Sequence, residues 1–491
     1  MGATISSMMG QTPKRPQMPP VPTDDILLMH PFDDTEFMRE CTLLWTTRFD
    51  EVLDGDKLNE ALSKLFEMDG WRRLGGRLRI NDQGKAEVHV PQVYTKERPA
   101  VHFTKVAHDM RFADHPEASK LPTKSDKLTM FPTPADYQSL GIGPGSPKGF
   151  QDLCSTDSPQ FSLHVVTFQD GTLVSLVFSH MTTDLGGLSM ILDAWCLVLA
   201  GKSDKVAKFP GYKDDVMAGL YRSDVTERPK IDGSLLSGWR LVVWGLRAFF
   251  DGWMAPQEPR MLRVPGKVID AIVAQARRDI SLENTVDANK PFVSENDVIV
   301  ALANHCVSQT MGRGRSIVTL IAVDPRDRLK SLFLNGSAYV QNAPCGAFFY
   351  CPVKDALDLP LGKVAMLSRQ AVVEQATEGQ LKAAAKVAYA SMIEGGNPPI
   401  VGDTTTSMLI SSNWAKSGFL NKTDFSPAVM GGKSAGPVRP SYYHMGKLES
   451  MIFPVSVVVN MGRDADRNLW LSGDLSADSW DTLTAYLKRY E

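Results

Sequence analysis

Apolar and polar positions along the chain change between the spacing of strands and the spacing of helices. Residues 172–179 form an apolar, β-prone run, and the alternating residues 161–168 precede it across a turn at 169–171. Two such runs separated by a glycine-containing turn predict a hairpin whose second strand is buried. Residues 188–199 then show the apolar content of a helix packed inside the protein.

The rest of the pattern mixes helices and strands without strict alternation, which predicts an α/β fold. Residues 56–68 carry apolar side chains on one helical face, and residues 75–90 predict a second hairpin. The same reasoning predicts helices over 295–310, 362–392 and 477–490 and strands over 316–323, 347–353, 408–411 and 455–460.

Residues 235–254 combine bulky apolar side chains with three charged ones, Arg240, Arg247 and Asp251. These charges argue against a segment that crosses a bilayer. The pattern predicts an amphipathic helix docked on the protein, and a helix lying on a membrane surface is the alternative interpretation.

The length of 491 residues suits two or three domains rather than one. The proline-rich, polar residues 1–22 predict a flexible leader. An N-terminal lobe over 23–215 contains the first hairpins, and a C-terminal lobe covers 260–491. Residues 216–259, with the amphipathic helix, are expected to cross between them.

Composition and charge exclude several classes of protein. The formal net charge of -3 gives no basic field that would recruit nucleic acid, and an apolar content of 43% is typical of a globular protein with substantial cores. The six cysteines are scattered without a C-x-x-C pair, which indicates reduced thiols of a cytoplasmic protein, with neither a disulfide framework nor a metal site. Residues 1–6 match the permissive N-myristoylation pattern, for which chance is a sufficient explanation.

His180 and Asp184 are the most informative residues of the sequence. They follow the buried strand directly, in a turn that Gly186 and Gly187 soften. A histidine placed there can act as a base near neutral pH, and a carboxylate four residues later can fix the local geometry. The competing interpretation of such a pair in isolation is a core histidine bonded to a backbone carbonyl.

A colinear series of short motifs decides between these interpretations. Its members are residues 23–28, 71–78, 180–186, 294–297, 323–329 with 339–342, and 412–414 with 424–425. In this order they resemble segments of the BAHD acyltransferase family, whose H-x-x-x-D-G motif aligns with His180 and Asp184. The chain resembles in particular the fungal trichothecene 3-O-acetyltransferase-like branch of that family.

The chain departs from the family pattern at four positions, the first of which is Leu185, which precedes the glycine of H-x-x-x-D-G. Gln341 stands where the family has the glycine of Y-x-G-N, and Ser426 and Pro427 stand where Gly-Trp usually follows Asp-Phe. The replacement of Gly-Trp by Ser426 and Pro427 affects the shape of the loop on the cofactor side of the channel more than it affects the catalytic base. Ser179 precedes His180, whereas the related peptide condensation domains carry a doubled histidine, and this favours a stand-alone acyltransferase.

The resemblance implies two similar lobes of the chloramphenicol acetyltransferase type, each a mixed β-sheet flanked by helices, with His180 in a solvent channel between them. It implies transfer of an acyl group, acetyl first, from acyl-CoA to a hydroxyl of a hydrophobic secondary metabolite. The family is commonly monomeric, and the expected partners are the two small substrates, with no nucleic acid and no metal; contact with a membrane is the minor alternative.

The resemblance also assigns roles to particular residues. His180 would be the general base, and Asp184 would pair with Arg326, or second with Arg328, rather than orient His180 in a catalytic dyad. Asp424 would support the channel. The side chains expected to bind the cofactor are Asn342, Ser411, Ser412, Trp414 and Lys433. His444 is expected on an exposed loop.

Two other functions remain open at this point. The same fold and base could catalyse a CoA-independent cyclisation or elimination of a natural-product intermediate. The scaffold could also serve as a non-catalytic protein that binds a small molecule.

Overall fold

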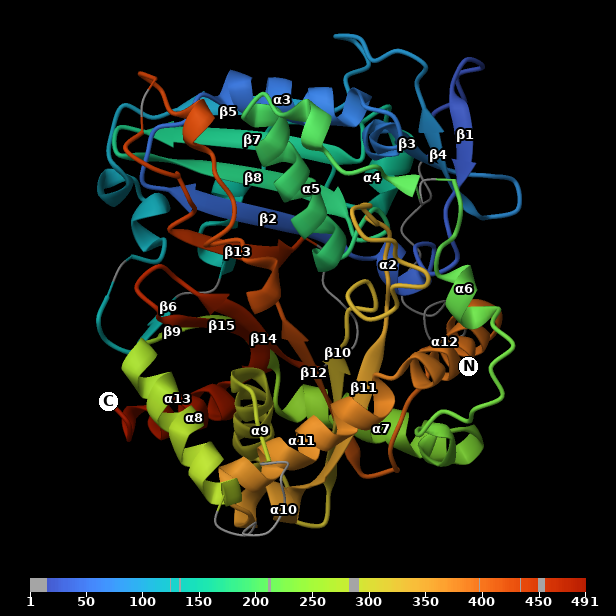
Figure 1. The fold of residues 1–491 in the computed structure, drawn as a ribbon, viewed down its shortest axis with the longest axis vertical. Coiled ribbons are helices and arrows are strands. Elements are labelled where there is room, and N and C mark those ends of the chain that lie inside the picture. Colours follow the sequence, from blue (N-terminus) through green and yellow to red (C-terminus); the bar gives the residue numbers. More distant parts are fainter. Residues whose placement is uncertain are drawn as a thin grey trace.

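The computed structural model describes residues 16–491 except 124, 132–133, 211–212, 282–290, 397, 433 and 449–454. Figure 1 shows two halves, an upper one built mainly from the N-terminal part of the chain and a lower one built mainly from the C-terminal part. Each half contains a large sheet with helices packed on it, which confirms the expected α/β architecture of two lobes.

The upper half is organised around a five-stranded sheet. Its strands, in spatial order, are β13 (Tyr442–Lys447), β2 (Thr42–Phe49), β8 (Gly171–Ser179), β7 (Phe161–Phe168) and β5 (His102–Ala107). Helices α3 (Gly55–Glu67) and α5 (Leu185–Leu199) pack together over one face of this sheet (Figure 1). All nine residues of β8 are buried, as the apolar run predicts.

A smaller, three-stranded sheet lies beside it. This sheet has the order β1 (Asp25–Leu28), β4 (Ala86–Val90) and β3 (Arg77–Ile80). The short helices of this half are α2 (Glu36–Arg39) and α4 (Phe150–Ser155). Both hairpins that the sequence predicts are present, β3 with β4 and β7 with β8.

The lower half contains a seven-stranded sheet. Its strands, in spatial order, are β11 (Gly346–Pro352), β10 (Ser316–Ala322), β12 (Thr406–Asn413), β14 (Ser456–Arg463), β15 (Leu469–Ser476), β9 (Gln257–Val264) and β6 (Thr129–Phe131). Strand β12 pairs in parallel with both β10 and β14. The helices that share a buried apolar core with this sheet are α8 (Gly266–Ser281), α9 (Glu295–Ser308), α10 (Val353–Asp358), α11 (Leu361–Gln375) and α13 (Ala477–Lys488).

Each half contributes one strand to the sheet of the other. Strand β13, late in the chain, pairs antiparallel with β2, and β6, early in the chain, pairs antiparallel with β9. The boundaries expected at 215 and 260 do not anticipate this exchange. The sequence signal is weak because β6 has three residues and the partners of both strands are remote along the chain.

The long helix expected over 362–392 is wrong in one respect, because it is two helices. Helix α11 ends at Gln375, and α12 (Glu378–Tyr389) begins after Thr377, whose side chain accepts a hydrogen bond from the backbone N–H of Gln380. A threonine in this position satisfies a free N–H group at the start of a helix and thereby favours a new helix over continuation of the old one. Helix α12 packs against the short α6 (Ala218–Tyr221).

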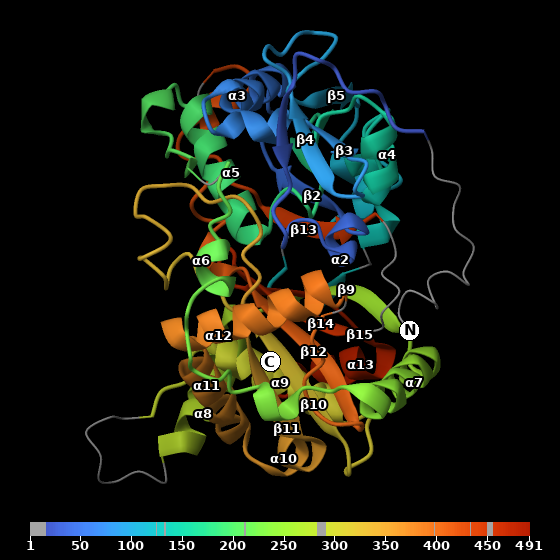
Figure 2. The same cartoon turned by 90° about the vertical axis from the view of Figure 1, so that its right-hand side faces the viewer.

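The amphipathic helix is present as α7 (Gly238–Met254), but its docking is much less extensive than expected. Trp244 is its one buried residue, and large apolar side chains elsewhere on the helix are exposed. Figure 2 shows α7 along the outer edge of the lower half. Among the described residues, no helix has both the length and the apolar character needed to cross a bilayer.

Candidate active site

His180 lies where β8 ends, and hydrogen bonds from both halves fix its backbone. Its N–H donates to the carbonyl of Cys41, just before β2, at 2.7 Å. Its carbonyl accepts from Nδ2 of Asn342, in the segment before β11, at 2.8 Å. The residue is thereby held at the junction of the two halves.

The imidazole of His180 is set up to be neutral. Burial lowers its pKa below the ordinary 6.5, and this effect outweighs the charge of Asp184, which acts to raise the pKa. Nδ1 makes no hydrogen bond with any described residue. Phe37 lies beside the ring, with ring centroids 6.4 Å apart. A neutral ring with an unused nitrogen has the protonation state that a general base requires.

Asp184 turns its carboxylate toward the lower half. Its oxygens accept from Nη2 of Arg326 at 2.9 and 3.0 Å, from the N–H of Ala343 at 2.9 Å and from the N–H of Gly187 at 2.9 Å. The expected pair with Arg326 is therefore present, whereas Arg328 is exposed. The bond to Gly187 also caps the first turn of α5.

Arg326 is the centre of this support and is itself buried. Besides Asp184, its guanidinium donates to the carbonyls of Tyr339 and Gln341 and to Asp324. Burial acts to lower the pKa of Arg326, but the carboxylates of Asp184 and Asp324 outweigh burial and raise it. The group is a permanent cation that ties the segment before β11 to the turn after β8.

Gly187 is required by a close backbone approach at this turn. A Cβ built there would lie 2.1 Å from the carbonyl oxygen of Val340, far inside contact distance. Because the obstacle is backbone, a larger residue would push the two halves apart rather than displace a side chain. This explains why the turn of this chain has a glycine three residues after Asp184.

Asp33 is a site residue that sequence reasoning missed. Its Oδ1 accepts from both the N–H and the Nδ2 of Asn342, at 2.9 and 2.8 Å. Burial raises its pKa to about 7, against the lowering effect of Arg73. Asn342 therefore bridges Asp33 to the carbonyl of His180. No periodicity marks Asp33, because it lies in the turn between β1 and α2.

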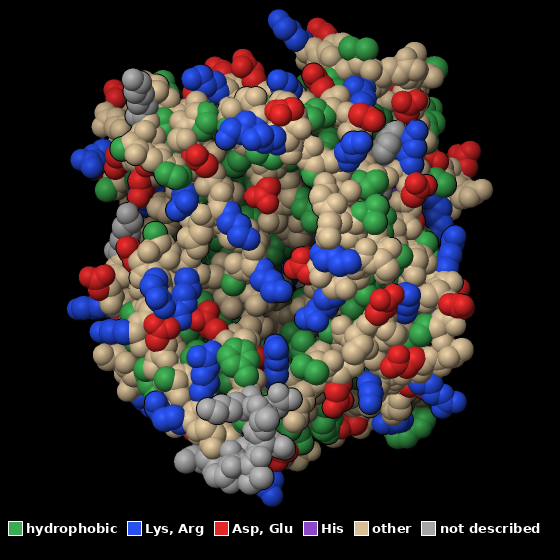
Figure 3. All heavy atoms as spheres, in the orientation of Figure 1, with side chains coloured by type: hydrophobic (Ala, Val, Ile, Leu, Met, Phe, Trp, Pro, Cys, Tyr) green, Lys and Arg blue, Asp and Glu red, His purple; other side chains and the backbone are tan. Residues whose placement is uncertain are grey.

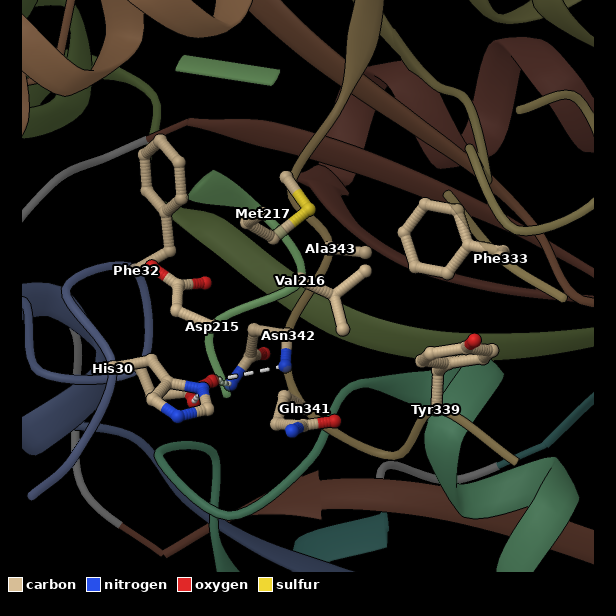
Figure 4. A pocket seen from close by; sticks show the side chains of 11 residues that line it. His30, Phe32, Asp215, Val216, Met217, Phe333, Tyr339, Gln341, Asn342 and Ala343 are labelled. Carbon is tan, nitrogen blue, oxygen red and sulfur yellow. Dashed lines mark hydrogen bonds and ion pairs between the residues drawn. The ribbon is translucent and has the colours of Figure 1, made fainter. Parts of the chain in front are cut away.

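A small pocket lies beside this bridge. Figure 4 shows that its wall combines apolar groups such as Phe333 and Met217 with polar ones that include His30 and Gln341. Nε2 of His30 and Nε2 of Gln341 are buried without a partner among the described residues. The surface is hollowed between the two halves in the centre of the view in Figure 3.

The remaining candidates lie at the end of β12. Ser411 is buried in the strand, and Ser412 accepts a hydrogen bond from Nε1 of Trp414 at 2.8 Å. The indole of Trp414 stacks on Tyr443, with ring centroids 6.3 Å apart. None of these three lines the pocket beside Asn342, and Lys433 lies outside the described residues.

Asp424 closes the loop between β12 and β13. Its Oδ1 accepts from the N–H groups of Ser426 and Val438 at 2.9 and 3.0 Å. Partial burial acts to raise its pKa, but these donors and Arg439 lower it overall. The carboxylate holds the two ends of the altered loop together, although Ser426 and Pro427 replace the usual Gly-Trp.

The expectation of an exposed His444 is wrong. This residue lies within β13 with 1% of its surface accessible, and burial lowers its pKa to about 3. The sequence before it reads as a loop because β13 is an edge strand whose partner β2 lies almost 400 residues earlier. The buried ring packs against Tyr137 and Tyr442 instead.

The ionisation of Asp33 should make the free energy of unfolding depend on pH. The folded protein holds this proton more tightly than the unfolded chain, because the pKa is about 7 against an ordinary 3.8. The stability contributed by the protonated form is complete below about pH 4 and is lost as pH rises through 7. Asp33→Asn keeps an oxygen for Asn342 and cannot ionise.

We therefore expect the free energy of unfolding of the wild type, relative to Asp33→Asn, to fall by a few kcal/mol between about pH 4 and pH 8. Urea unfolding at both pH values measures this difference. Parallel pH profiles for the two proteins would show that Asp33 does not titrate in the folded state.

A two-lobed α/β protein with a neutral histidine at the junction of its lobes is the arrangement of an acyltransferase. Three curated relatives align with almost the whole chain. They are the transcriptional regulator calD of Penicillium decumbens, at 34% identity over 97% of this chain and 98% of the relative; the acetyltransferase adrJ of Penicillium rubens, at 32% over 95% and 96%; and the O-acetyltransferase PaAT-2 of Phomopsis amygdali, at 31% over 96% and 99%. No family model matches the chain.

Solved structures give the same fold. TRI101 of F. graminearum complexed with coenzyme A and deoxynivalenol superposes with a TM-score of 0.64, at 16% identity over 95% of this chain and 99% of that one. Vinorine synthase superposes with a TM-score of 0.55, at 13% identity over 96% and 95%. With these relatives, the chain belongs to a family of fungal acetyltransferases, and its fold is that of TRI101 and vinorine synthase. It is an enzyme of the O-acyltransferase class.

Proposed function

We propose that this enzyme transfers an acyl group, acetyl in the first instance, from acyl-CoA to a hydroxyl of a hydrophobic secondary metabolite, with His180 as general base. Three properties of His180 together carry the assignment of the base. Burial lowers its pKa, which favours the neutral ring, and its Nδ1 makes no hydrogen bond with a described residue. Its backbone is hydrogen-bonded to both halves. The relatives named as acetyltransferases support the class of donor.

The chemistry needs no covalent acyl-enzyme. A hydroxyl is a poor nucleophile near neutral pH because it holds its proton tightly. The neutral ring of His180 takes that proton as the hydroxyl oxygen bonds to the thioester carbonyl carbon. The C–S bond then breaks as the carbonyl re-forms, and the imidazolium returns its proton to the departing thiolate. The products are an ester and free CoA.

Asp184 acts in this scheme by positioning. Its carboxylate is already engaged by Arg326 and by two backbone N–H groups, so it is not available to orient the imidazole directly. The engaged carboxylate also leaves burial as the dominant influence on the pKa of His180, which keeps the base neutral. This geometry supports the positioning role over the catalytic dyad.

The chain's own groups suit a large, partly polar donor. Buried donors and acceptors without partners, on His30, Gln341 and Asn342, belong to residues that line the pocket beside Asn342. They are available to substrate groups, because an unsatisfied buried polar atom costs free energy until it is bonded. We assign contacts with acyl-CoA to Asn342, Ser411, Ser412, Trp414 and Lys433.

The acceptor class follows from the neighbours. The TRI101 complexes contain coenzyme A together with deoxynivalenol or T-2 mycotoxin. By analogy, we propose a hydroxylated, largely apolar terpenoid or polyketide as the acceptor. We place the enzyme in the cytoplasm as a monomer.

The test is acceptor-dependent release of thiol. The full chain is incubated with acetyl-CoA and a panel of hydroxylated terpenoids and polyketides, and free thiol is followed with a chromogenic reagent while mass spectrometry follows the acceptor. We expect thiol release matched by a gain of one acetyl group on the acceptor.

Two results would overturn the proposal. Conversion of a metabolite in the absence of any acyl-CoA would indicate cyclisation or elimination by the same base. Tight binding of a metabolite without turnover, across acetyl-CoA and longer acyl-CoA donors, would indicate a binding protein.

A further inference from the structure

Helix α7 presents a continuous apolar face to solvent. On a helical wheel, eight residues of α7 share one side, because each successive residue is rotated by about 100°. They form what is here called the α7 apolar face: Trp239, Val242, Val243, Leu246, Phe249, Phe250, Trp253 and Met254. All eight are exposed, with Phe249 and Trp253 each 73% accessible.

The opposite side of α7 holds the helix on the protein. Trp244 is buried, and its Nε1 donates to the carbonyl of Thr406, at the start of β12, at 3.0 Å. Asp251, about two turns later on the same side, pairs with Nη1 of Arg315 at 3.1 Å. These two attachments fix the rotation of the helix, so the apolar face must point outward, in agreement with the exposure of its side chains.

The negative charge of α7 faces the protein, and its positive charges face solvent. Asp251 is used in the pair with Arg315, whereas Arg240 and Arg247 are exposed. These two arginines are seven residues apart and therefore lie on one flank of the α7 apolar face. The helix thus meets solvent with an apolar surface bordered by cations, which complements anionic lipid headgroups above an apolar interior.

The aromatic residues favour lipid over a protein partner. Trp239 and Trp253 stand near the two ends of the helix, and both are more than 70% exposed. An indole N–H buried in a dry protein interface needs a dedicated acceptor, whereas at a bilayer surface headgroups and water supply acceptors.

We propose that the α7 apolar face binds the surface of membranes containing anionic lipid, with the helix lying in the plane of the interface. With 17 residues and three charged side chains, α7 is too short and too polar to span a bilayer. This develops the alternative that the sequence left open for residues 235–254, a helix lying on a membrane surface. The inference rests on α7 alone and does not depend on which reaction the active site catalyses.

The test is flotation of the full chain with lipid vesicles. One set consists of phosphatidylcholine alone, and the other of three parts phosphatidylcholine to one part phosphatidylserine. We expect binding to both, tighter to the second, with a blue shift of tryptophan fluorescence. Phe249→Ser combined with Trp253→Ser should weaken binding about tenfold or more, because two large side chains no longer leave water.

Two further variants separate the contributions. Arg240→Gln combined with Arg247→Gln should remove the preference for anionic vesicles and retain binding to neutral ones. Phe292→Ser, a matched control at an aromatic residue 55% exposed beside α8, should bind vesicles like the wild type. Because the α7 residues changed are exposed, the variants should keep the thermal stability of the wild type.

Either of two results would overturn the proposal. The first is absence of binding to both kinds of vesicle. The second is a concentration-dependent dimer in sedimentation that the Phe249 and Trp253 changes abolish, since it would show that a second copy of the chain covers this face.

Discussion

Replacement of His180 by alanine is expected to lower kcat for acyl transfer by about 10²–10⁴-fold, the usual contribution of a positioned general base. The loss should fall on kcat, with the KM for acyl-CoA little changed, because the ring removes a proton and is not assigned a part in donor binding. Acceptor-dependent thiol release measures both constants. The unfolding midpoint should stay close to that of the wild type, since Nδ1 leaves no stranded partner behind.

The pH dependence gives this prediction a second readout. The base works only when neutral, and burial lowers its pKa below 6.5, so activity of the wild type should fall on the acid side only below that value. The residual activity of His180→Ala should lack this acid limb. A wild-type limb that persists unchanged in the variant would assign the titration to another group.

His164 offers a matched control. It is a buried histidine in β7 whose pKa burial also lowers, but its Nδ1 is bonded to Oγ1 of Thr104 at 2.7 Å. His164→Asn is expected to cost stability and to leave kcat within a few-fold of the wild type. An equal loss of kcat in both variants would mean that any disturbance of the upper sheet, rather than loss of the base, explains the effect.

The second large effect is expected at Asp184. Asp184→Ala should lower the free energy of unfolding by about 3–5 kcal/mol, because it leaves the buried guanidinium of Arg326 without its principal counter-ion. It also removes the acceptor for the N–H groups of Gly187 and Ala343. Urea unfolding at neutral pH measures the change, and catalytic activity should fall with it because the turn that carries His180 loses its support.

A double variant distinguishes support from direct catalysis. If Asp184 acts through Arg326, then Asp184→Ala and Arg326→Ala should each lower activity, and the combined variant should lose much less than the sum of the two losses in free energy. Arg326→Lys should not restore the wild-type properties, since a lysine cannot reach two carbonyls and two carboxylates in one plane. Additive effects would instead favour a dyad in which Asp184 acts on His180 independently of Arg326.

Local features of this protein could be predicted from sequence because they depend on neighbouring residues. The hairpin of β7 and β8 follows from alternation and a tight turn, and the placement of His180 at its end follows from where the apolar run stops. The pairing of Asp184 with Arg326 could not be predicted from neighbouring residues. It came from a motif resemblance, since the two residues are 142 positions apart.

What could not be predicted depends on contacts between distant segments. Asp33 gains its role from Asn342, 309 residues away, and nothing in the turn around it marks a buried carboxylate. The orientation of α7 is a similar case. Its sequence shows an amphipathic helix, but the hydrogen bond from Trp244 to Thr406 and the pair of Asp251 with Arg315 decide that the apolar side points away from the protein.

The exchange of β6 and β13 between the two sheets makes each lobe incomplete without the other. Residues 23–215 expressed alone would leave β2 as a bare edge and would carry β6 with no sheet to join, and the remainder of the chain would have the converse defect. Unpaired edges of this kind promote aggregation. The enzyme is therefore not expected to fold when it is divided at its linker. Because the exchanged strands join the two lobes, the lobes cannot open like a hinge, and the two substrates are expected to enter through openings between them.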